Sequence, residues 1–160
     1  MTRPIPPIIP DALRAVLDSE DLAAGVGITL LLLTCRDDGW PHLGMLSVGE
    51  VIVVDEWRVR LAVWPASATA SNLVARPRGT LVAVLPPTVW LLRVSVRPLP
   101  SVDTSLGGRL AAFEAEIAEA AADEAPYAVL EAGVRFRLKD ERATLSRWAE
   151  VRRALAEAAV

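Results

Sequence analysis

Cysteine, histidine and lysine are almost missing from this sequence of 160 residues. Cys35, His42 and Lys139 are the only residues of their types. One cysteine cannot form an intrachain disulfide, and one cysteine with one histidine cannot build a zinc site of the usual kind. We therefore expect no metal centre, and a protein that folds in a reducing compartment, namely the cytoplasm.

The sequence also lacks an excess of basic charge, since its formal net charge is −3 at pH 7. Nucleic acids and acidic membrane surfaces recruit proteins through fields of positive charge. We accordingly expect neither of them as a partner. A small molecule is the ligand class that we expect instead.

No apolar run is long enough to cross a bilayer. The longest, ITLLLLTC over residues 28–35, is far shorter than the ~20 residues that a membrane helix needs. The opening stretch MTRPIPPIIP is interrupted by proline and does not match the apolar core of a signal peptide. With 52% hydrophobic residues, the chain is expected to fold as one domain over residues 1–160.

Three segments have the apolar spacing of helices. Two are the terminal helices expected over residues 10–19 and 143–158, and the third is a helical insert expected over 104–130. In the insert, the acidic run EAEIAEAAADE is interpreted as the solvated face of the helix. In the last helix, Trp148 lies in the apolar stripe, so core packing is its default role.

Between the terminal helices, about six antiparallel strands are predicted over residues 27–138, the last of them over 133–138. The run GITLLLLTC is interpreted as a strand buried on both faces, and Asp38-Gly39 after it favours a tight hairpin. Gly44 and Gly49 lie inside the expected return strand, where they indicate bulges or bends. Open sheet edges pair with other strands, so we expect a small barrel with flanking helices.

Small barrels often complete their burial by pairing as two-fold dimers. Trp64 and Trp90 are expected to be exposed, and exposed tryptophans suit such an interface. The sequence therefore favours a homodimer.

The stretch WPASATASNL, over residues 64–73, consists almost entirely of small and hydroxyl-bearing residues. Ser67 precedes a helical run, so its hydroxyl can cap the helix N-terminus. A helix N-terminus with nearby hydroxyls, here Ser67 and Thr69, also binds phosphate. A strong phosphate site usually adds Lys or Arg, and none lies between Arg60 and Arg76. Capping alone and phosphate binding both remain open.

The remaining single residues carry weaker signals. His42 stands at a strand start and can act as a general base, but a lone histidine without a neighbouring carboxylate or cysteine is more often structural. Cys35 at the end of a buried strand is more often a small hydrophobe than a nucleophile. The catalytic residues therefore stay unassigned.

The order and spacing of these elements resemble the pyridoxamine 5′-phosphate oxidase-like family, the FMN-binding split barrels. The segment around DDGWP is similar to the first hairpin of the family with its DG.P turn. Asn72-Leu73 and Arg76-Pro77-Arg78 stand at the positions of its NL..NPR-type return. WLLRVSVRPL resembles the long strand that follows, and GVRFRLKDERATLSRWAEVRRAL the final strand and tail. The resemblance covers about residues 10–158 and implies a mainly β fold, a six-stranded antiparallel split β-barrel with flanking helices (α+β).

In this family FMN lies in a groove between two subunits, with its phosphate near the small helix and its ring against barrel strands. The resemblance thus implies FMN as cofactor and a homodimer. The residues that it would place around FMN are Met45, Leu46 and Ser47 at the ring, Trp64, Ser67 and Thr69 at the phosphate, and Trp90 and Trp148 as walls of the pocket.

The charged part of the family's phosphate site is missing from these positions. Ala68 and Thr69 stand where the oxidases carry an Arg-Lys pair, and Gly44 and Gly49 where they carry further basic residues. Each charged hydrogen bond to a phosphate contributes roughly 1.5–3 kcal/mol. The alternative sources of charge are Arg76, Arg78 and Arg93, reaching in from another direction or from the second subunit.

Two functions follow from the resemblance. The first is an FMN-binding flavoprotein, an oxidoreductase of unassigned substrate in which FMN performs the redox chemistry. The second is a non-catalytic split-barrel binding module that has lost the FMN phosphate site and holds another planar ligand, such as a deazaflavin or haem. Oxidation of vitamin B6 itself is not expected, because that substrate also carries a phosphate that needs basic partners.

Overall fold

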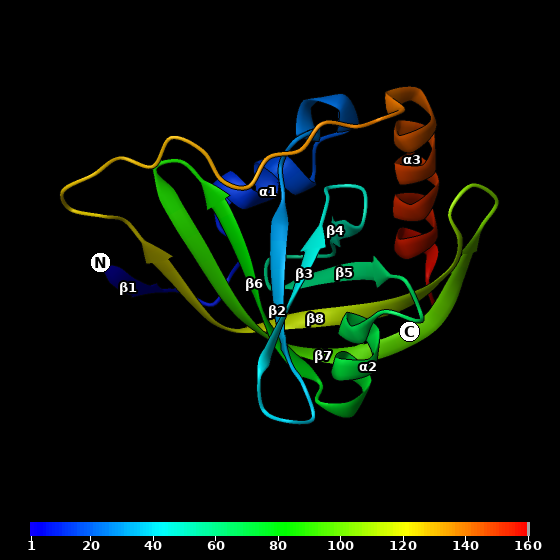
Figure 1. Cartoon of the computed structure of the whole chain (residues 1–160), viewed down its shortest axis with the longest axis horizontal. Helices are drawn as coiled ribbons and strands as arrows, with labels where there is room; N and C mark the ends of the chain where they lie inside the picture. Colours follow the sequence, from blue (N-terminus) through cyan, green and yellow to red (C-terminus); the bar gives the residue numbers. More distant parts are fainter. Residues whose placement is uncertain (160) are drawn as a thin grey trace.

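The computed structural model describes residues 1–159, which build one antiparallel sheet with helices packed on it (Figure 1). The order of neighbouring strands is β3-β2-β6-β7-β8-β5-β4, and β1 pairs with β8 beside this path. The strands are β1 (Thr2–Ile5), β2 (Leu30–Cys35), β3 (Pro41–Leu46), β4 (Val51–Val53), β5 (Arg58–Val63), β6 (Arg78–Leu85), β7 (Thr88–Thr104) and β8 (Gly108–Asp123). The helices are α1 (Asp11–Leu17), the short 3₁₀ helix η1 (Leu22–Gly25), α2 (Ala68–Ala75) and α3 (Glu141–Glu157).

The sheet has eight strands, so the predicted number of six is wrong. The mainly β, antiparallel α+β class is confirmed. In the described part of the chain the end strands β3 and β4 are not hydrogen-bonded to each other, so the sheet is curved but not closed. Among the same residues, no helix combines the length and the apolar character that crossing a membrane requires.

The helical insert predicted over 104–130 is wrong, because this segment forms the end of β7, a tight turn and all of β8. Both faces of β8 are covered over residues 110–115, so the alternation of a strand is hidden there. Phe113 and Ile117 face the main core, whereas Leu110 packs with the residues beneath α3. A bulge also shifts the register between Arg93 and Val94 of β7. Together these features produce a helix-like spacing of apolar residues in a strand.

The strand predicted over 133–138 is also absent from the structure. Residues 124–140 form an irregular segment that runs from the end of β8 past α1 to the start of α3 (Figure 1). Phe136 and Leu138 still pack against the core, but Val134 is half exposed. The strand that the sequence analysis missed is β1, which contains Pro4 and pairs with β8 alone, at an edge where proline is tolerated.

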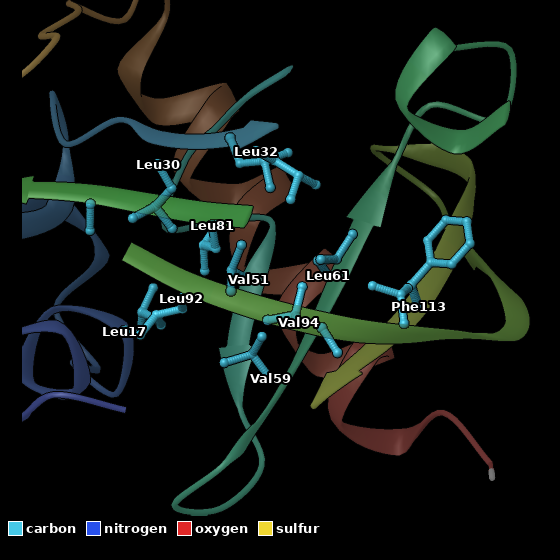
Figure 2. Packing of buried hydrophobic residues seen from close by; sticks show 14 of the residues in the cluster. Leu17, Leu30, Leu32, Val51, Val59, Leu61, Leu81, Leu92, Val94 and Phe113 are labelled. Atoms are coloured by element: carbon cyan, nitrogen blue, oxygen red, sulfur yellow. The ribbon is translucent and has the colours of Figure 1, made fainter. Parts of the chain in front are cut away.

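The core lies inside the curve of the sheet. Leu32, Leu81 and Leu92 stand opposite one another on β2, β6 and β7. On the other half of the sheet, Leu61 of β5 faces Phe113 of β8. Figure 2 shows these side chains pointing into one interior. Complete burial of such a side chain stabilises the fold by about 1.5–3 kcal/mol.

Strand β2 is not buried on both faces, contrary to the prediction. Its inner residues Leu30 and Leu32 are buried, but Leu31 is only partly buried and Leu33 is 36% exposed. No element among residues 1–159 covers this outer face.

A buried carboxylate holds α3 on the sheet. Glu114 of β8 is almost fully buried and accepts hydrogen bonds from Arg60 Nε at 3.0 Å and from an Arg97 terminal nitrogen at 2.6 Å. Arg58 approaches the same carboxylate at 3.4 Å. Arg60 also donates to three backbone carbonyls at the end of α3, those of Leu155, Ala156 and Ala158. The positive charge thus lies at the negative end of the helix dipole.

Burial by itself raises the pKa of Glu114. Hydrogen bonds from Arg97 and Arg60, together with the positive charges of Arg97 and Arg58, outweigh burial, so the pKa lies below its ordinary value of 4.5. The carboxylate therefore stabilises the folded state in its ionised form.

We expect acid to destabilise the protein through Glu114. Because the folded-state pKa is lowered, the contribution of this carboxylate is complete above the ordinary value of 4.5 and is lost as the pH falls through the folded-state pKa. Glu114→Gln should lower the free energy of unfolding at pH 7 by about 3 kcal/mol, because it leaves the buried Arg60 without its carboxylate partner. It should also flatten the pH dependence below that value. Urea unfolding at a series of pH values measures both effects.

Glu116→Gln is the matched control, because Glu116 is exposed and lies on the same strand. It should leave the pH dependence at its wild-type slope. Equal slopes in the wild type and in Glu114→Gln would contradict the assigned role of Glu114.

Gly49 is needed for the close approach of α3 to the turn between β3 and β4. A Cβ at this position would lie 2.0 Å from Trp148 Cγ, where no atom fits. We expect Gly49→Ala to lower the free energy of unfolding by about 1–3 kcal/mol or more through overpacking. Thermal unfolding measures this, with Ser146→Ala on the exposed face of α3 as control. An unchanged Tm would contradict the close contact.

Candidate functional site

A hollow of about 240 Å³ lies where the two ends of the curved sheet approach each other. One wall comes from the end strand β3 and the other from β5, near the opposite end of the sheet. The start of α2 and a side chain of α3 complete it. Its chemically distinctive lining residues are Gly44, Met45, Glu50, Trp64, Ser67, Thr69 and Arg147.

The hydroxyl wall of the hollow is built by the start of α2. Ser67 is the N-cap residue, and its Oγ accepts a hydrogen bond from Ala70 N at 3.1 Å, so the predicted cap is confirmed. An accepting hydroxyl keeps its own hydrogen free to donate, so capping does not exclude contact with an anion. Asn72 donates to Thr34 Oγ1 of β2 at 3.0 Å and fixes the helix on the sheet.

Gly44 allows this helix to approach β3. A Cβ at Gly44 would lie 2.7 Å from Thr69 Oγ1, so the Thr69 hydroxyl stands directly over the strand backbone. Any side chain at position 44, including the basic ones expected from the family, would collide with it. The pairing of β2 with β3 is regular here, with Leu32 opposite Gly44, so the bulge predicted at Gly44 is wrong. The return strand as a whole is instead divided into β3 and β4 by the turn that contains Gly49.

The positive charge of the hollow comes from Arg147 of α3. Its guanidinium carbon lies 5.3 Å from the ring centroid of Trp64, in a cation–π arrangement. A terminal nitrogen of Arg147 lies 3.8 Å from Glu50 Oε1. Its Nε is buried and has no hydrogen-bond partner among residues 1–159. A buried donor without a protein partner is uncommon, and a bound water or ligand can satisfy it.

Contacts of α3 with two parts of the chain hold Arg147 in place. Arg152 donates to the carbonyl oxygens of Val48 at 2.7 Å and Val51 at 2.9 Å. Burial lowers the pKa of Arg152, although the charge of Asp18 acts in the opposite direction. Glu150 accepts hydrogen bonds from the backbone at the tip of the β7–β8 hairpin, from Ser105 N and Leu106 N.

Arg147 is the residue that the sequence analysis missed. Arg76, Arg78 and Arg93, considered there as sources of charge, do not line this hollow. Arg76 pairs with Asp37 at 2.7 Å and Arg93 with Glu119 at 2.6 Å. No local motif marks Arg147, because only the packing of α3 brings it beside α2.

The structure brings together five of the predicted site residues and separates three. Met45, Leu46, Trp64, Ser67 and Thr69 all line the hollow. Ser47 lies just behind it, where its backbone N–H and hydroxyl donate to Glu50 Oε2 at 2.6 and 2.9 Å.

Trp90 and Trp148 lie elsewhere, so neither forms a wall of this hollow. Trp148 is buried against Gly49, and its ring meets Phe136 edge to face at 6.4 Å. Trp90 on β7 packs against the core and is only partly exposed, so the exposure predicted for it is wrong. Trp64 is 56% exposed, as predicted.

The two other reactive side chains also stand apart from the hollow. His42 is half-buried on β3, opposite Thr34. Cys35 is a free, half-buried thiol at the end of β2. Among residues 1–159, no three His, Cys, Asp or Glu side chains gather as metal ligands would.

An exposed apolar surface adjoins the hollow on the outer face of β2 and β3. Leu33 stands opposite Leu43, and Leu31 opposite Met45. Leu43 and Met45 are more than half exposed. This outer surface, together with Trp64, forms the apolar rim of the hollow.

The comparisons with known proteins begin with a curated relative. No family model matches the chain. This chain is 30% identical over 138 residues to the uncharacterized protein YclD of Bacillus subtilis (strain 168), and the alignment covers 86% of this chain and 89% of YclD. This identity and coverage show common membership of one family.

Solved structures share the fold at low identity. A pyridoxamine 5′-phosphate oxidase-like protein of Lactobacillus delbrueckii matches with a TM-score of 0.56 and 14% identity, over 74% of this chain and 98% of that one. An F420 reductase matches with a TM-score of 0.51 and 14% identity, over 70% and 98%. A heme binding protein of Mycobacterium smegmatis matches with a TM-score of 0.51 and 13% identity, over 76% and 57%.

At these identities the solved structures establish the fold and not the ligand. The antiparallel sheet and the small helix between β5 and β6 agree with the resemblance found in the sequence. The chain therefore belongs to the same family as Bacillus subtilis YclD and has the pyridoxamine 5′-phosphate oxidase-like split-barrel fold.

Proposed function

We propose that this protein is a flavoprotein oxidoreductase that binds FMN with its phosphate in the hollow between β3, β5 and α2. The observation that carries the proposal is that Arg147, whose buried Nε has no hydrogen-bond partner among residues 1–159, lines the same hollow as the hydroxyl-bearing Ser67 and Thr69. These groups are all hydrogen-bond donors, and donors around a positive charge are what a phosphate requires.

The residues present fit the phosphate end of FMN. Ser67 and Thr69 offer hydroxyl hydrogens, and the first turn of α2 offers backbone N–H groups that no helical carbonyl satisfies. Arg147 supplies the charge that Ala68 and Thr69 lack at the family's Arg-Lys positions. A charged hydrogen bond of this kind contributes roughly 1.5–3 kcal/mol, enough to replace part of the lost basic pair.

The hollow is too small to enclose a whole flavin. Its volume is about 240 Å³, whereas ligand pockets usually reach ≈ 300–1,000 Å³. The ring would therefore extend along the apolar rim, against Met45 and Leu46 of β3. FMN supplies hydride or electron transfer when bound. The chain would hold its phosphate, orient its ring and exclude water from one side.

A second copy of this chain is the partner that would cover the other side. The outer surface of β2 and β3 is apolar and lies beside the hollow, with Leu33, Leu43 and Met45 exposed. Burial of such a patch favours association. Pairing of two copies through this surface would form a groove over each hollow.

The alternative is a binding module without turnover that holds a different planar ligand. Glu50 supports it, because this carboxylate also lines the hollow and offsets the charge of Arg147. The haem ligand of one structural neighbour and the F420 reductase activity of another show that proteins of this fold serve different ligands.

The first experiment is an FMN titration followed by the visible spectrum after desalting. We expect FMN to be retained, and Arg147→Gln to weaken FMN binding by roughly tenfold or more, as loss of one charged hydrogen bond implies. Riboflavin, which lacks the phosphate, should bind both proteins equally.

Arg142→Gln is the control, since Arg142 is exposed on the same helix and outside the hollow. It should bind FMN as the wild type does. A wild-type protein that releases all added FMN would contradict the proposal and favour the binding module.

The pairing of two copies is tested by Leu43→Glu. A charge in the middle of the apolar surface should convert a dimer into a monomer, because a buried, unpaired carboxylate is strongly unfavourable. Size-exclusion chromatography with light scattering measures the mass. Val129→Glu, in the irregular segment before α3, is the exposed control. A monomeric wild type, or a variant that stays dimeric, would contradict this interface.

A further inference from the structure

We propose that Glu50 determines the charge selectivity of the hollow by competing with a bound anion for Arg147. The inference deepens the proposed function and rests on it for the identity of the ligand. It concerns the anionic end of the ligand alone. It predicts that Glu50 removes the preference for doubly charged groups over singly charged ones that Arg147 alone would give the hollow.

The carboxylate of Glu50 is fixed by the turn that carries it. Its Oε2 accepts hydrogen bonds from Ser47 N at 2.6 Å and from Ser47 Oγ at 2.9 Å. The other oxygen, Oε1, is directed to the Arg147 side of the hollow, 3.8 Å from a terminal nitrogen. Glu50 therefore acts on Arg147 through its charge, since this separation is too long for a hydrogen bond.

The turn itself has little freedom. Gly49 is packed directly against Trp148, and Arg152 donates to the carbonyl oxygens of Val48 and Val51 on either side. The carbonyl oxygen of Glu50 accepts from Ala62 N of β5 at 2.9 Å. The backbone of Glu50 is thus held by the same contacts that fasten α3, and the hydrogen bonds from Ser47 hold its carboxylate.

Arg147, in contrast, has donors to spare. It is 25% exposed, stacks on Trp64 and leaves its Nε without a partner in the described chain. An arginine presents five N–H donors in a planar fork. Its fork therefore still has donors for an anion in the hollow that it shares with Ser67 and Thr69.

The competition follows from the charges. In the described part of the chain, Glu50 and Arg147 are the two ionisable side chains that line the hollow. Their charges cancel, so an incoming anion gains the attraction of Arg147 but meets the repulsion of Glu50. Attraction and repulsion both grow with the charge of the ligand, so Glu50 cancels the advantage that Arg147 alone would give to a doubly charged group, and removal of Glu50 restores it. A phosphomonoester, which carries close to two charges above its second pKa of ≈ 6, is affected more than a phosphodiester with one.

The test uses Glu50→Gln, which removes the charge and keeps an oxygen for Ser47. The probes are methyl phosphate and dimethyl phosphate at pH 8 and constant ionic strength. Binding is followed by the NMR signal of Arg147 Nε–H, assigned by its absence in Arg147→Lys. We expect Glu50→Gln to bind methyl phosphate about five- to tenfold more tightly, and dimethyl phosphate about two- to threefold.

Glu56→Gln is the matched control, because it removes the same charge from an exposed position in the turn between β4 and β5. It should change neither affinity. Glu50→Ala, which removes the side chain completely, should shift the ratio of the two affinities in the same direction as Glu50→Gln. Agreement of these two variants excludes an effect of local packing.

Equal gains for both probes, no gain, or the same gain in Glu56→Gln would overturn the role of Glu50. Absence of binding to every variant would overturn it together with the phosphate site. If methyl phosphate behaves as expected but FMN does not bind, the proposed function fails and the inference about Glu50 stands. If FMN binds through Arg147 and Glu50→Gln changes nothing, the inference alone fails.

Discussion

The attachment of α3 to the sheet is the constraint on which the rest of this structure depends. Its centre is the buried carboxylate of Glu114, which cannot remain ionised in the interior without arginines around it. Arg60 satisfies Glu114 and at the same time the last carbonyl groups of the helix. A second arginine, Arg152, performs the same task at the turn between β3 and β4. Arg60 and Arg152 therefore hold α3 at two places, in addition to the contacts of its apolar stripe.

The candidate site is a consequence of this attachment. The start of α2 brings hydroxyls and free N–H groups to the open end of the sheet, but no positive charge. The positive charge comes from Arg147 of α3. Arg147 lies at the hollow because Arg152, further along the same helix, binds the turn between β3 and β4. Glu50 belongs to the same turn that receives Arg152 and Trp148. Stability of the fold and electrostatics of the hollow thus depend on one set of contacts.

The structure changes the interpretation of the basic residues that are missing from the family's phosphate positions. The absence of the Arg-Lys pair at Ala68 and Thr69 does not leave the hollow without a cation, since Arg147 lies against it from another element. Gly44 could not carry a basic side chain, because the Thr69 hydroxyl occupies that space. The small residues on β3 and α2 and the arginine on α3 therefore surround the same hollow. A comparison of local motifs detects the small residues but not Arg147.

The sequence by itself determined the class of fold, the terminal helices, the hairpin of β2 and β3 and the cap at Ser67, because these depend on local periodicity, turn residues and a hydroxyl next to a helix start. It could not determine β8, whose two covered faces and bulge disguise the alternation of a strand. Nor could it show that Arg147 lines the hollow, although its neighbour Trp148 on α3 lies in the core, the role that its apolar stripe favoured. Which face of a helix meets which hollow is decided by packing between distant segments, and only the tertiary structure contains that information.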